Sequence, residues 1–258
     1  MASFTSHDGV DIAYDDAGPR EGRAALLVHG FASNRHEAWK RTGWYAAFER
    51  RGQRVVAMDL RGHGESGKPH DPAAYDAETM VGDVVGLMDH LDLQQVDLFG
   101  YSMGSRLALA VARTHPGRVA HLIIGGVGER ALQPSASGAA LAQAMEADDP
   151  ESIEVPLLKS FRQFADEQGE DRMALAAMVR GKSAPLTADD LAALRMPVLV
   201  AAGSGDALAG DPRGLADHIP GAHAVSLPGC DHFNAIPHAL LKAAVFDFLD
   251  GYLDFPSP

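Results

Sequence analysis

The chain has 258 residues, of which 46% are hydrophobic, and its 22 basic and 35 acidic side chains give a formal net charge of −13. This length suits one large α/β domain with an insertion, and the acidic balance argues against a protein that holds nucleic acid or an anionic membrane through its net charge. Cys230 is the only cysteine, which excludes a disulfide within the chain.

The first half of the chain alternates between short apolar runs and segments with helical spacing. The apolar runs are hydrophobic on both faces, as expected of strands buried in a parallel sheet. In order, the predicted elements are a hairpin over residues 4–14, strands over 24–28, 55–58, 96–99 and 119–127, and helices over 37–50, 79–91 and 103–115. This alternation predicts an α/β fold in which helices cover both faces of a mostly parallel sheet.

Between residues 128 and 196 the alternation stops. Alanine-rich segments with helical spacing make up this stretch, at residues 139–147, 155–167 and 172–180. A connection of this length is much longer than an ordinary loop of an α/β protein. We therefore expect a helical cap over residues 128–196, inserted into a core that residues 1–127 and 197–258 form.

The sheet resumes with strands over residues 197–202 and 224–227, and a helix over residues 239–253 follows. The amino-terminal residues include no basic segment followed by an apolar run, so we expect no signal peptide. No apolar stretch is long enough to span a bilayer. The sequence thus predicts a cytoplasmic protein with neither a membrane nor a nucleic-acid partner, and it leaves the oligomeric state open.

Residues 100–104, with the sequence Gly-Tyr-Ser-Met-Gly, join the strand over 96–99 to the helix after it. The pattern Gly-x-Ser-x-Gly at such a junction is typical of a sharp turn with a strained serine at its apex. Gly100 and Gly104 suit this turn because a β-carbon at either position would collide with neighbouring backbone. The serine, Ser102, is a poor nucleophile at neutral pH unless a base removes its proton.

His232 and Asp206 follow two later strands of the predicted sheet. The carboxyl ends of parallel strands share one edge of an open sheet, and ligands bind at that edge. An imidazole titrates near neutrality, so His232 suits the base that Ser102 needs, and Asp206 would orient the imidazole and stabilise its charged form. Asp211, whose sequence context is that of a helix cap, and Glu129 are alternatives to Asp206.

Five motifs resemble those of the α/β-hydrolase superfamily, and the resemblance covers the chain apart from the cap. They are His29-Gly30-Phe31, Asp59-Leu60-Arg61-Gly62-His63-Gly64-Glu65-Ser66, Gly100-Tyr101-Ser102-Met103-Gly104, Gly203-Ser204-Gly205-Asp206 and Gly229-Cys230-Asp231-His232-Phe233. The resemblance implies the α/β-hydrolase fold, with an eight-stranded, mostly parallel sheet, and the order serine, aspartate, histidine is the one expected of it. The chain looks most similar to single-domain esterases and enol-lactone hydrolases with a small helical cap.

The resemblance also implies an oxyanion hole made by the backbone N–H groups of Phe31 and Met103. Met103 would lie in the first turn of a helix, where unpaired N–H groups favour negative charge. We expect a substrate pocket beneath the cap, lined by His29, Gly30, Phe31, Tyr101, Met103, Leu208 and Phe233. No cofactor and no metal are expected, because the sequence has neither a dinucleotide or phosphate-loop pattern nor metal-ligand spacing.

These residues predict a serine hydrolase that cleaves a small-molecule ester, lactone or thioester through an acyl-enzyme intermediate. With the same triad, carbon–carbon bond hydrolysis of a dienoate and perhydrolase- or haloperoxidase-like activity are alternatives. The first needs groups that hold a substrate carboxylate, for which Arg35, Asn34 and Arg106 are candidates. A ligand-binding receptor without turnover is the alternative of another class.

Overall fold

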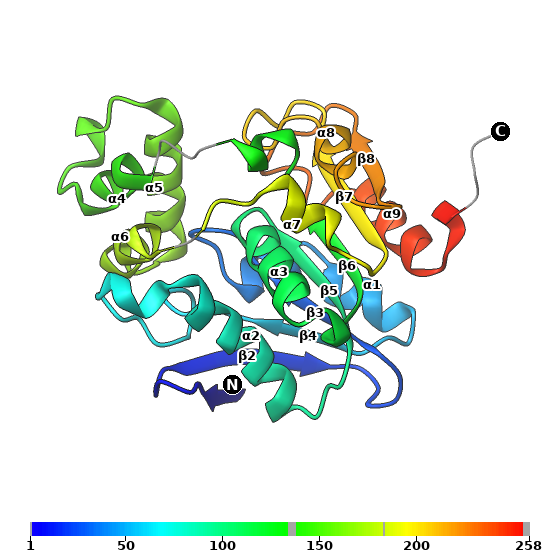
Figure 1. Cartoon of the computed structure of the whole chain (residues 1–258). Helices are drawn as coiled ribbons and strands as arrows, with labels where there is room; N and C mark the ends of the chain where they lie inside the picture. Colours follow the sequence, from blue (N-terminus) through cyan, green and yellow to red (C-terminus); the bar gives the residue numbers. More distant parts are fainter. Residues whose placement is uncertain (1, 134–137, 183, 255–258) are drawn as a thin grey trace.

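The computed structural model describes residues 2–133, 138–182 and 184–254. Its strands are β1 (Ala2–Thr5), β2 (Asp11–Ala17), β3 (Ala24–Val28), β4 (Val55–Met58), β5 (Val96–Tyr101), β6 (Val119–Gly125), β7 (Val198–Gly203) and β8 (His223–Leu227). They form one sheet in the order β1-β2-β4-β3-β5-β6-β7-β8. β2 pairs antiparallel with β1 and β4, whereas all pairs from β4 to β8 are parallel. This sheet confirms the predicted fold class (Figure 1).

Helices lie between most of the strands. The α-helices are α1 (Trp44–Arg50), α2 (Ala77–His90), α3 (Met103–Thr114), α4 (Gly138–Glu146), α5 (Pro156–Gln168), α6 (Arg172–Arg180), α7 (Ala188–Ala192), α8 (Pro212–Ala216) and α9 (Ala239–Leu249). Shorter elements are the π-helix η1 (His36–Lys40) and the 3-10 helices η2 (Pro72–Tyr75), η3 (Pro116–Arg118), η4 (Glu129–Leu132), η5 (Pro150–Ser152) and η6 (Tyr252–Asp254).

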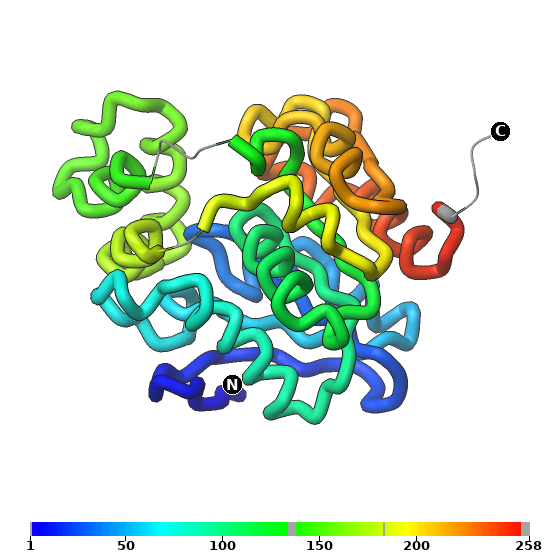
Figure 2. The backbone as a smooth tube through the Cα atoms, viewed as in Figure 1, coloured from blue at the N-terminus to red at the C-terminus, as the bar shows by residue number. Residues whose placement is uncertain are grey.

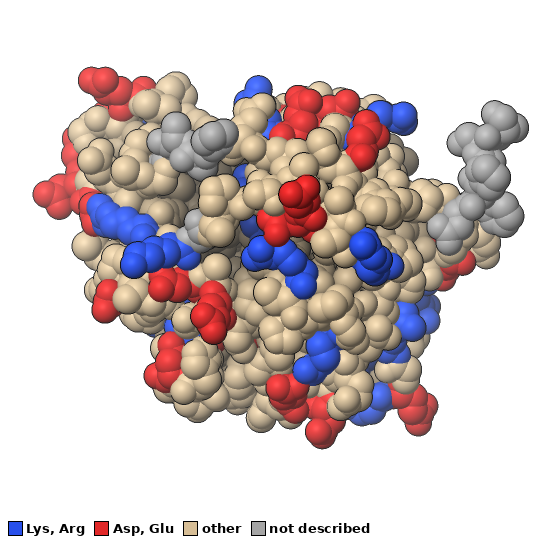
Figure 3. All heavy atoms as spheres, viewed as in Figure 1, with Lys and Arg blue, Asp and Glu red and all other residues tan. Residues whose placement is uncertain are grey.

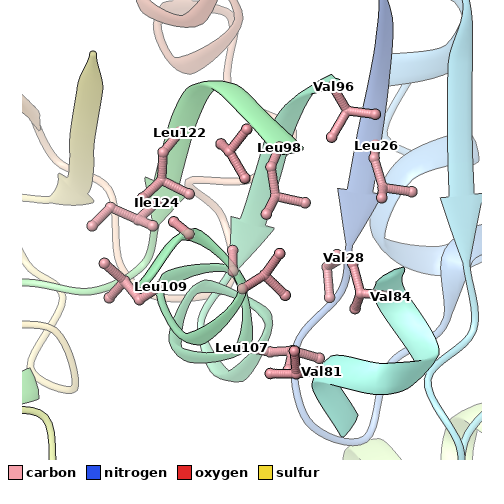
Figure 4. Close-up of a cluster of buried hydrophobic side chains, with 14 of the residues drawn as sticks. Leu26, Val28, Val81, Val84, Val96, Leu98, Leu107, Leu109, Leu122 and Ile124 are labelled. Carbon is pink, nitrogen blue, oxygen red and sulfur yellow. The ribbon is translucent and has the colours of Figure 1, made fainter. Parts of the chain in front are cut away.

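Alternate residues of the buried strands serve two hydrophobic layers, one on each face of the sheet. Leu26 and Val28 of β3 point toward α2 and α3, with which they share one cluster (Figure 4). Ala25 and Leu27 of the same strand belong to a second cluster, together with Trp44 of α1 and residues of α9. Both faces of β3 are therefore buried, which explains why its sequence is apolar throughout.

The helix predicted over residues 37–50 is two separate elements, η1 and α1. Gly43 stands between them with a φ of 82°, in the left-handed region that interrupts a helix. The short helix α7 was not predicted, because five residues are fewer than the window over which helical spacing can be recognised.

Two predicted elements end earlier than expected. β6 ends before residue 127, the predicted end of that strand, and α9 ends before residue 253. A glycine with a positive φ lies just beyond each element, Gly126 with 65° and Gly251 with 76°. In both places a left-handed residue redirects the chain within two residues of the element's end.

Helices α4, α5 and α6 of the predicted insertion form a lobe beside the core, in contact with the segment around η2 (Figures 1 and 2). The lobe has a small hydrophobic cluster of its own, which also takes in Ala32 of the core. At the two ends of the insertion, η4 and α7 instead contribute Ala131 and Leu191 to the main core cluster. The predicted domain boundaries stay a prediction, but the lobe proper corresponds to α4–α6.

Glu170, between α5 and α6, ties this lobe to the core. Its carboxylate accepts hydrogen bonds from Asn34 Nδ2 at 3.0 Å and from the Gly64 N–H at 2.8 Å. Burial raises the pKa of the Glu170 carboxyl above its ordinary value. The lobe is thus held near the loops that follow β3 and β4, at the sheet edge where the site was expected.

Acidic and basic side chains are interspersed over the face of the molecule that Figure 3 shows. Among the described residues, no helix combines the length and the apolar character that crossing a bilayer requires.

Gly104 lets the start of α3 pack directly on the end of β3. A β-carbon there would overlap the Val28 carbonyl oxygen. We expect Gly104→Ala to lower the free energy of unfolding by more than about 3 kcal/mol, because rigid backbone would have to move. Gly117→Ala is the matched control, since its β-carbon would meet nothing within 4 Å. Urea denaturation of both variants tests this, and equal losses of stability would contradict it.

Candidate active site

Ser102 lies at the apex of the turn between β5 and α3. Its φ of 55° and ψ of −115° are strained for a residue with a side chain. The turn is held by the Ser102 N–H, which donates to the Gly125 carbonyl at 2.8 Å, and by the Ser105 hydroxyl, which contacts the carbonyls of Gly100 and Gly125 at 2.8 Å each. These bonds fix the serine at the carboxyl end of the central strand.

His232 connects Ser102 to Asp206. The Ser102 hydroxyl lies 2.9 Å from His232 Nε2, and His232 Nδ1 lies 2.8 Å from Asp206 Oδ2. A carboxylate only accepts hydrogen bonds, so Nδ1 carries the proton and Nε2 accepts the serine proton. His232 is 8% exposed and Asp206 is 4% exposed, so the bond between them is buried. The arrangement can take a proton from the serine as it attacks an electrophile.

The geometry distinguishes Asp206 from its two rivals. Asp206 Oδ1 accepts hydrogen bonds from the N–H groups of Leu208 and Ala209, which turns Oδ2 toward His232. Asp211 caps α8 by accepting from the Arg213 N–H at 2.9 Å. The Glu129 side chain packs beside Gly210, in the loop before α8, and beside Gly214, within α8. Asp206 is therefore the acid that contacts the histidine.

Tyr101 supports the backbone of His232. Its hydroxyl donates to the His232 carbonyl oxygen at 2.7 Å, and burial raises the pKa of the phenol, so it stays protonated. We expect Tyr101→Phe to lower kcat/KM about 3- to 10-fold, the value of one hydrogen bond that positions the base. Tyr45→Phe, which removes a hydroxyl bonded to Asp15, is the control and should stay within about 2-fold. Ester hydrolysis rates measure both, and equal effects would contradict the positioning role.

Two backbone N–H groups flank the serine. Met103 follows Ser102 at the start of α3, and Phe31 follows Gly30, where an added β-carbon would lie 3.2 Å from Ser102 Cβ. Within the described part of the chain, neither the Phe31 nor the Met103 N–H has a hydrogen-bond acceptor. Unpaired N–H groups beside a nucleophile are what an oxyanion hole requires.

His29 and His63 hold the loop that carries Phe31. His29 Nδ1 donates to the Gly30 carbonyl and its Nε2 accepts from the Leu60 N–H. His63 contacts the Arg61 carbonyl through Nδ1, and its Nε2 accepts from the Ala32 N–H at 3.1 Å. Burial lowers the pKa of both imidazoles, so both are neutral at pH 7.

These contacts correct one sequence-based expectation. We expected His29 to line the substrate pocket, but its side chain is fully buried and both ring nitrogens bond to backbone. His29 therefore shapes the loop beside the serine without facing either of the cavities described next.

Two cavities meet at Ser102 and His232. The larger has a volume of about 690 Å³ and the smaller about 250 Å³. The other expected pocket residues surround them: Met103 and Leu208 line the larger, Gly30, Tyr101 and Phe233 line the smaller, and Phe31 lines both. Their contact with a substrate stays a prediction.

The lobe supplies cavity walls that the sequence did not identify. Phe161 of α5 lines both cavities, and its ring lies 5.9 Å from that of Phe31. Phe233, which is 45% exposed, contacts the rings of Phe161 and Phe164. The one available signal was that these two phenylalanines are the only aromatic residues of the predicted cap.

The three candidates for holding a substrate carboxylate differ in their partners. Arg35 contacts three carboxylates, those of Asp15, Asp59 and Glu65. Asn34 donates to Glu170. Only Arg106, of the three, lines a cavity that contains Ser102.

Comparisons with known proteins identify the family to which this fold belongs. The family model described as alpha/beta hydrolase fold matches residues 25–175. A non-heme chloroperoxidase of Streptomyces lividans is 37% identical over 125 residues, which are 48% of this chain and 44% of that relative. The chain spans less than half the length of the curated relatives it matches, which include epoxide hydrolases as well as chloroperoxidases.

Solved structures match over nearly the whole chain. A thermophilic esterase from Thermogutta terrifontis is 28% identical with a TM-score of 0.78, and the match covers 96% of this chain and 97% of the esterase. The enol-lactonase from Burkholderia xenovorans LB400 is 26% identical with a TM-score of 0.75, and the match covers 96% of this chain and 100% of the enol-lactonase. Because the family model covers more than half of its residues, the chain belongs to the alpha/beta hydrolase fold family.

Proposed function

We propose that the protein is a serine hydrolase that cleaves a small carboxylic ester, lactone or thioester through an acyl-enzyme intermediate. The observation that carries this proposal is the hydrogen-bonded chain from Ser102 through His232 to Asp206, which opens on two cavities at the serine. Two cavities at one nucleophile suit a substrate with two parts, one on each side of the bond that breaks.

In the first half of the reaction, Ser102 Oγ attacks the substrate carbonyl carbon while its proton passes to His232 Nε2. The carbonyl electrons move onto oxygen, and the N–H groups of Phe31 and Met103 bind the resulting oxyanion. The tetrahedral intermediate collapses as the carbon–heteroatom bond breaks. His232 gives its proton to the leaving group, and the acyl group stays on Ser102.

In the second half, a water molecule attacks the acyl carbon and gives a proton to His232. The bond between the acyl carbon and Ser102 Oγ breaks, and the proton returns to the serine. Asp206 keeps the proton of His232 on Nδ1 throughout and stabilises the imidazolium of each half-reaction.

Two related reactions are alternatives with the same triad. With hydrogen peroxide in place of water, the same acyl-enzyme would give a peracid, and this alternative is favoured by the similarity to chloroperoxidases. Carbon–carbon bond hydrolysis remains the other alternative with this triad. A panel of esters, lactones and dienoates, with and without peroxide, separates the three.

Burst kinetics test the acyl-enzyme route. With p-nitrophenyl acetate and butyrate, we expect a rapid release of one p-nitrophenol per active site, followed by slower steady turnover if deacylation limits the rate. If acylation limits the rate instead, added methanol should convert part of the acyl-enzyme to a methyl ester. The ratio of methyl ester to free acid should then be the same for all substrate esters that share an acyl group. Hydrolysis with neither a burst nor a constant partition ratio would contradict an acyl-enzyme.

A further inference from the structure

One face of α3 points its side chains into the larger cavity. Ser102 precedes this helix, and Met103, Arg106, Leu107 and Ala110 all line that cavity. These positions are three or four residues apart and therefore lie on one side of a helix. The Arg106 N–H donates to the Ser102 carbonyl at 3.4 Å, so the arginine lies one helical turn from the nucleophile.

Within the described part of the chain, the Arg106 guanidinium has no carboxylate partner. Its one hydrogen bond is a long one of 3.3 Å from Nη1 to the Ala131 carbonyl, which leaves most of its five N–H donors without an acceptor. Desolvation alone shifts the pKa of Arg106, downward from its ordinary value, because no nearby acid opposes it.

Among the described residues, two other arginines line this cavity, and each has a closer hydrogen-bond partner than Arg106, although only the partner of Arg113 is a carboxylate. Arg113 pairs with Asp190 at 2.9 Å, and Arg130 donates to the Ala207 carbonyl at 2.5 Å. Asp190 is the only acidic residue among the described residues that line the larger cavity. The cavity therefore carries excess positive charge within a chain whose net charge is −13.

Elsewhere in the protein, buried arginines have carboxylate partners. Arg35, Arg54, Arg61 and Arg162 each form at least one ion pair. Arg106 differs from these four arginines, because it is exposed where it lines the cavity and has no carboxylate partner in the described part of the chain. A bound anion would supply the missing partner of Arg106.

We propose that Arg106 binds a carboxylate of the substrate, so that the enzyme prefers esters, lactones or thioesters that carry a free carboxylate a few atoms from the reacting carbonyl. This inference rests on the proposed function. One guanidinium neutralises one charge and matches the two oxygens of a carboxylate in a fork.

The location of Arg106 also limits the length of the substrate. Side chains four residues apart on a helix have β-carbons roughly 5–6 Å from each other, so a short spacer between carbonyl and carboxylate should fit. The smaller cavity, walled by Phe161, Phe164 and Phe233, suits the uncharged part of the substrate.

Matched pairs of esters test the proposal. One set has the carboxylate on the acyl part: the mono-p-nitrophenyl esters of succinate, glutarate and adipate, each against the neutral p-nitrophenyl ester of equal chain length. The other set has it on the alcohol part: 4-acetoxybenzoate against phenyl acetate. For each pair, the ratio of kcat/KM for the anionic and the neutral ester is measured in the wild type and in variants.

We expect the ratio for the preferred spacer to fall about 10- to 100-fold in Arg106→Met, the value of one or two hydrogen bonds between charged groups. Arg106→Lys should restore part of it, because the charge stays while the fork is lost. Arg130→Met is the control, since it removes the same charge from the wall of the same cavity, and its ratio should change by less than about 3-fold. An equal fall in Arg130→Met would show a general field effect and overturn the proposal.

A binding measurement separates this proposal from the proposed function. Glutarate should bind the wild type more tightly than Arg106→Met in calorimetry, whether or not the protein turns over any ester. One outcome would reject the carboxylate site alone. In it, the protein hydrolyses neutral esters, shows no preference for the matched anionic ester in either set, and binds glutarate equally well with and without Arg106→Met. No hydrolysis of any ester, with glutarate binding that depends on Arg106, would reject only the proposed function.

Discussion

Ser102→Ala is expected to reduce kcat/KM for p-nitrophenyl butyrate by about 10⁴-fold or more, because the proposed acyl-enzyme forms on the Ser102 hydroxyl. Residual hydrolysis would come from the binding cavities and the two N–H groups beside the serine. The variant should keep its fold, since His232 is the only hydrogen-bond partner of the Ser102 hydroxyl among the residues that the structure describes. Steady-state rates, together with the melting temperature, measure both effects.

Ser160→Ala is the control for this prediction. Ser160 is an exposed residue of α5 whose hydroxyl donates to the Pro156 carbonyl of its own helix. Its removal should leave the rate within about 2-fold of the wild type. A Ser102→Ala protein that is folded and still hydrolyses esters at the wild-type rate would exclude Ser102 as the nucleophile.

Asp206→Asn should reduce kcat/KM by about 10³- to 10⁴-fold while the structure is kept. An amide can turn its NH₂ toward His232, which would move the imidazole proton from Nδ1 to Nε2. His232 could then no longer accept the proton of Ser102. Steady-state hydrolysis of p-nitrophenyl butyrate measures the loss.

Asp211→Asn provides the comparison, because Asp211 lies five residues away and caps α8 instead of contacting the histidine. Asparagine is also a good helix cap, so stability should change by less than about 1 kcal/mol and activity by less than about 3-fold. If Asp211→Asn were the more damaging of the two variants, the acid would have to be reassigned.

The core of the fold could be predicted from the sequence because its signals are local. Runs such as residues 24–28 are apolar on both faces only when both faces are buried, and helical spacing follows them at regular intervals. The junction at residues 100–104 was predictable for the same reason. Its two glycines and its strained serine belong to one continuous turn.

The packing of the cap was not predictable in this way. Its helices could be recognised from their spacing, but alanine-rich faces do not specify which partner they pack against. The contacts that hold the lobe to the core, such as Glu170 with Asn34 and Gly64, join segments more than a hundred residues apart. No local pattern contains that pairing.

Residue type also failed to show which polar side chains face the substrate. His29 lies in a glycine-containing loop beside the serine, and nothing in its neighbours reveals that both ring nitrogens bond to backbone. In the same way, Arg35 and Arg106 were equal candidates for a carboxylate. They became distinct only once Asp59 and Glu65 were found against Arg35, while no carboxylate was found against Arg106 in the described part of the chain.

Covalent labelling gives the most direct test of Ser102 as an activated nucleophile. Incubation of the folded protein with a fluorophosphonate, followed by intact-mass and peptide analysis, should show one phosphonyl group, located on Ser102. Ser102→Ala should take up none. A folded wild-type protein that stays unlabelled, or that carries the label on another residue, would contradict the assignment of the triad.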